Sequence, residues 1–180
     1  MSVQAASTSS ARLSRAGFLI ALAVAWFSPA SAQELAAPPA ELLQGATQRL
    51  EAGRLTSNDI DGEIRQWVFY FGASWCGPCR AFMPDLLRAY DTWRTQKRSI
   101  ELVFVSGDGS CSSMESNIQQ KRMPWQVVAS RKRDSLPSLR GLSDQALPGL
   151  VVVNQDGIVT DSSFWKEQYG RYQQVLLAIN

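Results

Sequence analysis

The chain has 180 residues, among them 18 basic residues, 16 acidic residues, three cysteines and no histidine. A formal net charge of +2 lacks the basic excess of a protein that binds nucleic acid or an anionic membrane, and neither partner is expected. With so few cysteines and no histidine, a structural zinc site of four ligands is not expected either.

Residues 1–32 have the layout of a secretory signal peptide. Arg12 and Arg15 precede an apolar run of 11 residues, 17–27, which is shorter than the roughly 20 residues of a membrane-spanning helix. Small residues then end at Ala32, the pattern that a signal peptidase reads. We predict export with cleavage after Ala32; an uncleaved anchor or a buried N-terminal helix is the alternative.

Cleavage would leave residues 33–180, which are 148 residues with 16 basic and 16 acidic side chains and no net charge. This is the size of one domain with a sizeable core, and we expect a monomer without stable membrane insertion. Residues 33–66 are interpreted as a linker and a helical or extended extension, and residues 67–180 as the folded domain. In an oxidising compartment two of the three cysteines can pair, which leaves one thiol over.

The first half of the folded part is predicted to alternate helices and strands. Residues 41–53 have apolar positions at helical spacing. The runs 67–71 and 100–108 are apolar without alternation, which is typical of strands buried on both faces. An amphipathic helix is predicted over 80–96, and a second one after Ser112, which has capping-box spacing to a glutamate three residues on.

The second half predicts a short strand within 124–130, a helical turn at 135–142 and a hairpin over 147–162. A closing helix follows, with apolar positions facing inward at Tyr169, Tyr172, Leu176 and Ile179. Strand–helix–strand–helix followed by a hairpin and a helix predicts an α/β fold with a central mixed β-sheet flanked by helices.

The stretch "ASWCGPC" places Cys76 and Cys79 where the strand 67–71 gives way to the helix 80–96. Free N–H groups and the macrodipole at a helix N-terminus stabilise a thiolate, the species that attacks disulfides. Cys79 lies one turn further on, more shielded, and can resolve the mixed disulfide. Pro78 can occupy the first turn without losing a needed hydrogen bond.

Two other uses of the pair are weaker. Zinc would need further ligands that the chain does not supply in a recognisable pattern. A purely structural disulfide across so short a loop would remove little chain entropy and stabilise the fold weakly. The residues therefore favour redox exchange.

The cysteine motif, with Pro84 five residues after Cys79, resembles the thioredoxin superfamily, in which a proline kinks this helix. The stretch "ALPGLVVV" is similar to the family's cis-proline segment, in which Pro148 would face the cysteines and keep metals off them. The resemblance implies a thioredoxin fold with catalytic residues Cys76, Cys79 and Pro148. It implies substrate contacts at Trp75, Gly77, Pro78 and Leu147.

The stretches "YDTW", "ELVFVSGD" and "MPW", and the 72 positions from Cys76 to Pro148, resemble the tryparedoxin/nucleoredoxin-like (TlpA-like) branch. Two positions depart from thioredoxins. Tyr70 stands where a buried carboxylate assists proton transfer, and Gly149 follows the proline where threonine is common.

The Gly-Pro dipeptide resembles reducing members of the superfamily. We therefore predict a periplasmic thiol–disulfide oxidoreductase that needs no cofactor and reduces protein disulfides, with electrons supplied by a membrane donor or another redox partner. A dedicated reductant for cytochrome c maturation is an alternative within this class. A copper(I) carrier on Cys76 and Cys79, with Cys111, is the alternative from a different class, although such carriers normally use a histidine.

The remaining polar candidates receive simpler interpretations. Cys111 is expected near the active cysteines, at the carboxyl end of the strand 100–107, as a solitary loop thiol rather than a third redox cysteine. Asp108 is interpreted as a solvated acid rather than a proton acceptor, and the basic residues 131–133 as a solvated loop. Three tryptophans are predicted to be packing residues: Trp67, Trp93 and Trp125.

Overall fold

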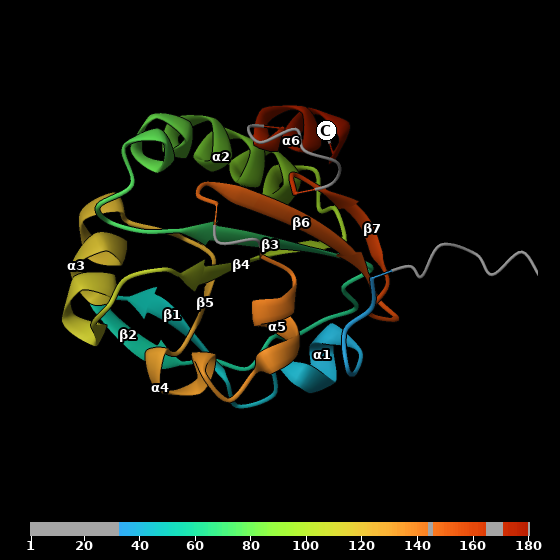
Figure 1. Ribbon diagram of the computed structural model, residues 1–180, viewed down its shortest axis with the longest axis horizontal. Coiled ribbons are helices and arrows are strands. Elements are labelled where there is room, and N and C mark those ends of the chain that lie inside the picture. The colour runs from blue at the N-terminus through green and yellow to red at the C-terminus, as the bar shows by residue number, and fades with distance from the viewer. Residues whose placement is uncertain (1–32, 144–145, 165–170, 180) are drawn as a thin grey trace, which may run out of the picture. The chain divides into compact units, whose positions relative to one another are not determined.

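Seven strands form one mixed sheet in the computed structural model, which describes residues 33–143, 146–164 and 171–179 (Figure 1). The strand order is β2-β1-β5-β4-β3-β6-β7, with β3, β4 and β5 parallel and β6 antiparallel to β3. The strands are β1 (Thr47–Glu51), β2 (Arg54–Ser57), β3 (Gln66–Gly72), β4 (Ile100–Ser106), β5 (Gln126–Val128), β6 (Gly149–Asn154) and β7 (Val159–Ser162).

Helices cover both faces of this sheet. The longest, α2, lies beside α6 on one face, whereas α1 and α5 lie against the other, with α4 next to α5 (Figure 1). No helix in the described part of the chain combines the length and hydrophobicity needed to cross a membrane. The helices are α1 (Pro39–Leu42), α2 (Gly77–Thr95), α3 (Cys111–Lys121), α4 (Ser130–Arg133), α5 (Pro137–Gly141) and α6 (Tyr172–Ile179).

The central strand β3 is buried on both faces, which confirms the interpretation of its continuous apolar run. Val68 and Tyr70 pack under α2, α3 and α6, whereas Phe69 and Phe71 pack towards α1 and α5. Burying each large apolar side chain is favourable by about 1.5–3 kcal/mol, so the sheet is held from both sides. The three tryptophans predicted to be packing residues are all fully buried: Trp67, Trp93 and Trp125.

The helix predicted over 41–53 is wrong. The chain leaves α1 and turns at Gly45, whose φ of +61° is left-handed, and then enters β1. Ala52 and Gly53, also at positive φ, close a hairpin in which β1 pairs antiparallel with β2. Pairing of β1 with β5 holds the hairpin in the sheet, so tertiary contacts override the helical spacing. Residues 33–66 therefore supply two strands to the sheet.

The helices predicted after the first two buried strands are present, but α3 begins differently. Its N-cap is Ser110, whose hydroxyl accepts a hydrogen bond from the Ser113 N–H at 3.1 Å, so the predicted capping box at Ser112 is wrong. In α6, Leu176 and Ile179 are buried as expected. Tyr169 lies outside the described residues.

Glu101 on β4 is a buried carboxylate that the sequence did not single out. It accepts a hydrogen bond from the Tyr90 hydroxyl at 3.0 Å, and Arg49 Nη2 lies 3.6 Å from its other oxygen. Burial raises the pKa of Glu101 above its ordinary value, and the Arg49 charge and the Tyr90 hydrogen bond offset only part of that effect.

Replacing Glu101 with glutamine should remove part of the pH dependence of stability. A carboxyl whose pKa is raised on folding binds more protons in the folded state, so the free energy of unfolding falls as pH rises from 4.5 through the folded pKa. Glutamine cannot ionise but can still accept from Tyr90. Urea unfolding at a series of pH values tests this, and an unchanged pH profile in Glu101→Gln would contradict it.

Candidate active site

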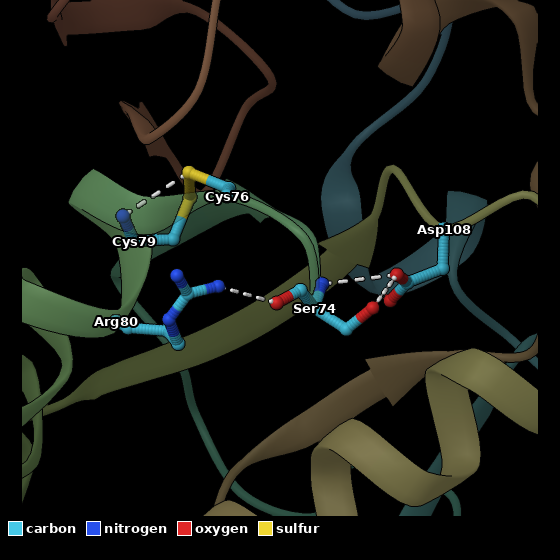
Figure 2. The surroundings of a disulfide bond; sticks show 5 residues. All are labelled: Ser74, Cys76, Cys79, Arg80 and Asp108. Atoms are coloured by element: carbon cyan, nitrogen blue, oxygen red, sulfur yellow. Dashed lines mark hydrogen bonds between the residues drawn. A yellow bond between two sulfur atoms is a disulfide. The ribbon is translucent and has the colours of Figure 1, made fainter.

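The cysteine pair forms a disulfide where β3 gives way to α2 (Figure 2). Cys76 is the N-cap of α2, and its Sγ accepts a hydrogen bond from the Cys79 N–H at 3.1 Å. Pro78 lies in the first turn of the helix, as predicted. Once the pair is reduced, this N–H and the helix N-terminus are placed to stabilise a thiolate on Cys76 rather than on Cys79.

Both cysteines are buried in the disulfide form, with exposed fractions of 4% for Cys76 and 3% for Cys79. The predicted difference in shielding is therefore absent from the oxidised protein, because Ala73 and Leu147 pack against both residues as one cluster. Trp75, next to Cys76 in the chain, is instead 66% exposed.

Leu147 packs against the cluster that Cys76 and Cys79 form with Ala73, and Pro148 is the next residue along the chain. The peptide bond between them is cis. Leu147 also approaches Gly107, the residue after β4, so closely that a Cβ on this glycine would lie 3.1 Å from Leu147 Cδ1. The Leu147 N–H and C=O make no hydrogen bond to any other described residue, so both can pair with an extended segment of a substrate.

Gly149 departs from the family pattern for a reason visible in the packing. A Cβ at this position would overlap the ring of Phe164, which covers the Gly149 backbone. The same ring packs edge-on against Phe71, with the two ring centroids 6.0 Å apart. Phe164 thus fills the space that a threonine side chain would need.

We expect Gly149→Ala to destabilise the fold by about 1–3 kcal/mol, the usual cost of overpacking a well-filled site. Truncating the ring should relieve the overlap, so the same change in a Phe164→Ala background should cost less. The check is a double-mutant cycle of urea unfolding free energies. Additive effects of the two substitutions would show that the ring is not the obstacle.

Asp108 is not a solvated acid, as the sequence suggested, but a buried one with an exposed fraction of 3%. Its Oδ1 accepts hydrogen bonds from the backbone N–H of Ser74 at 2.9 Å and from the Ser74 hydroxyl at 2.6 Å (Figure 2). Its Oδ2 accepts from the Ser106 hydroxyl at 2.8 Å. The carboxylate is buried because it satisfies the donors of the loop that carries Cys76.

Two arginines donate hydrogen bonds to the backbone of the two segments that Asp108 joins. Arg80 on α2 donates to the Ser74 carbonyl at 3.0 Å (Figure 2). Arg133 on α4 donates to the carbonyls of Ser106 at 3.0 Å and Asp108 at 2.9 Å, so it is not part of a solvated loop as predicted. Ser74 follows β3 and Asp108 follows β4, and these two strands are parallel neighbours. Both residues therefore lie at the same edge of the sheet, which was the signal in the sequence for their contact.

Tyr70 occupies the position where thioredoxins carry a carboxylate. Burial raises the pKa of Tyr70 above its ordinary value, and Tyr172 adds to the effect, so the phenol stays protonated in the physiological range. A Cβ on Gly72 would lie 2.7 Å from the Tyr70 hydroxyl oxygen, so glycine leaves that space open. No base for Cys79 is available at this position.

Cys111 is a free, exposed thiol, but it is the first residue of α3 rather than part of a loop. Its Sγ accepts a hydrogen bond from the Ser130 hydroxyl at 2.6 Å. Within the described ranges, histidine, cysteine, aspartate and glutamate nowhere gather in a group of three that could hold a metal ion.

A reactive-cysteine pair that caps a helix, next to a cis-proline on a mixed sheet, defines a thiol–disulfide oxidoreductase of thioredoxin fold. The chain belongs to the Thioredoxin-like family, which matches residues 65–159, just over half of its length.

Its relatives include tryparedoxins and nucleoredoxins. Tryparedoxin of Trypanosoma brucei brucei is 32% identical over 120 residues, which cover 65% of this chain and 79% of that protein. Probable nucleoredoxin 1 of Arabidopsis thaliana is 38% identical over 91 residues, which cover 49% of this chain but only 15% of the nucleoredoxin. Among solved structures, tryparedoxin I from Leishmania major shares the fold, with a TM-score of 0.59 and 24% identity over 77% of this chain and 91% of that one.

Proposed function

We propose that this oxidoreductase is exported to a periplasm and reduces disulfides in client proteins. The location rests on the signal-peptide pattern of residues 1–32. The observation that supports a reducing role is the sparse stabilisation of the Cys76 sulfur. Its one hydrogen bond from a described residue comes from the Cys79 backbone, and the chain has no histidine. A strong oxidant needs a more stabilised thiolate, because that stabilisation favours its reduced form.

In the proposed reaction the Cys76 thiolate attacks one sulfur of the client disulfide and displaces the other as a thiolate. Cys79 then loses its proton and attacks Cys76 Sγ, which releases the second client thiolate. The enzyme ends with the Cys76–Cys79 disulfide and the client with two thiols, so two electrons have passed to the client. During the exchange, Leu147 pairs with the client backbone and Trp75 contacts the client.

The enzyme must be reduced again after each turnover. We propose that a membrane protein or another redox partner supplies the two electrons by the reverse exchange at the same cysteines. The enzyme works as a monomer in this scheme and requires no cofactor, because both half-reactions are thiol–disulfide exchanges.

The reduction potential of the Cys76–Cys79 couple tests the direction of electron flow. Equilibration with glutathione or dithiothreitol should give a value near the roughly −270 mV of thioredoxin. A value near −120 mV would mark an oxidant and reverse the proposal. A Cys111→Ser variant measured alongside should give the same potential. Export is tested separately, since the mature protein should begin at Gln33.

A further inference from the structure

A groove of about 1210 Å³ adjoins the cysteine pair. Trp75 lines it at one place and Leu147 at another, so it is continuous with the surface where a client disulfide must dock. Phe71 and Pro137 add further apolar surface. The groove is therefore shaped to receive chain on either side of a client cysteine rather than the disulfide alone.

Among the described residues, the charged side chains that line this groove are Arg133, Asp134 and Arg140. The Arg133 guanidinium already donates hydrogen bonds to the carbonyl groups of Ser106 and Asp108, and its Nε lies 3.4 Å from Asp134 Oδ1. Arg140, on α5, is exposed, and its guanidinium has no hydrogen bond or ion pair with any described residue. One cation of the groove is thus unpaired within the described chain.

The segment 130–141, which contains α4 and α5, carries four basic side chains and one carboxylate. Two of the four, Arg133 and Arg140, line the groove together with Asp134, so the described lining carries one net positive charge, whereas residues 33–180 as a whole carry equal numbers of basic and acidic side chains. A local excess of one sign beside a binding surface attracts partners of the opposite sign and repels those of the same sign.

We propose that this groove binds an extended segment of a client protein that carries an aspartate or glutamate close to its disulfide cysteine, with Arg140 as the carboxylate ligand. The inference rests on the proposed function and adds the chemical class of client. A guanidinium presents parallel N–H donors that match a carboxylate, whereas Trp75 and Leu147 supply apolar and backbone contacts nearer the cysteines. A lysine at the same place in the client would meet the unpaired charge of Arg140 and be disfavoured.

The test is reduction kinetics with synthetic peptide disulfides. In one set a single glutamate is moved through the positions on either side of the cysteine, and each peptide is paired with a glutamine peptide of otherwise identical sequence. At one or more positions the glutamate peptide should have the higher kcat/KM, by roughly two- to fivefold, as for one exposed ion pair, and the preference should shrink in high salt.

Variants of the full chain assign the preference to one side chain. Arg140→Gln should bring the ratio of the two kcat/KM values close to one, and Arg140→Glu should invert it. Arg131→Gln, an exposed cation outside the groove, should keep the wild-type ratio. Equal rates for all peptide pairs in the wild type, or a preference that survives Arg140→Gln, would overturn the inference while leaving disulfide reduction intact. If no peptide is reduced, the proposed disulfide reduction is wrong, and the inference that clients carry an acidic residue is wrong as well.

Discussion

Cys76→Ser should reduce disulfide exchange to background, a loss of at least ~10³-fold in kcat/KM. A serine hydroxyl at the N-cap accepts the hydrogen bond from the Cys79 N–H, so the start of α2 is kept. It cannot replace the thiolate, because an alcohol neither ionises near neutral pH nor forms a disulfide. Reduction of a peptide disulfide, followed by the thiols released, measures the effect.

Replacing the second cysteine separates the attacking role proposed for Cys76 from the resolving role proposed for Cys79. Cys79→Ser keeps the attacking thiol and removes the resolving one, so the protein should accumulate as a mixed disulfide with its client, visible on a non-reducing gel. Cys111→Ser should behave as the wild type, because this thiol lies on α3 and outside the cluster that holds the pair. If Cys79→Ser loses all reactivity while Cys76→Ser still forms mixed disulfides, the roles are reversed.

The sequence predicted those parts of the molecule that short-range patterns determine. The continuous apolar runs of β3 and β4 indicated a doubly covered sheet, and Cys-Gly-Pro-Cys at the start of a helix indicated redox chemistry. Both follow from a few neighbouring residues, because burial on two faces and helix capping are local requirements.

Failures occurred where distant segments decide the outcome. The helical spacing over 41–53 was overridden by strand pairing between β1 and β5, whose paired residues are 79 and 81 positions apart in the chain. The burial of Asp108 depends on a distant partner as well as on nearby Ser106, since two of its three hydrogen-bond donors belong to Ser74, which is 34 positions earlier. Gly149 could be explained only by the ring of Phe164, and the role inferred for Arg140 only by a groove that joins α5 to the cysteine loop.

Asp108→Ala should lower the free energy of unfolding by about 3–5 kcal/mol, because three neutral donors lose a buried acceptor and each unsatisfied donor costs about 1–3 kcal/mol. The substitution leaves three donors without their acceptor: the N–H and hydroxyl of Ser74 and the hydroxyl of Ser106. Asp108→Asn keeps one acceptor oxygen and should cost less. Asp91→Ala, an exposed acid on α2, is the control and should change stability by less than about 0.5 kcal/mol.

The same substitution tests whether the loop before Cys76 needs its anchor on β4. Arg133 bonds to backbone carbonyls, which alanine retains, so Asp108→Ala should free the loop without releasing α4. Arg80 would then hold Ser74 from one side only. Below its melting temperature the folded variant should therefore exchange disulfides more slowly, because Cys76 is less well positioned against Leu147. Full activity in a destabilised Asp108→Ala protein would show that the network serves folding alone.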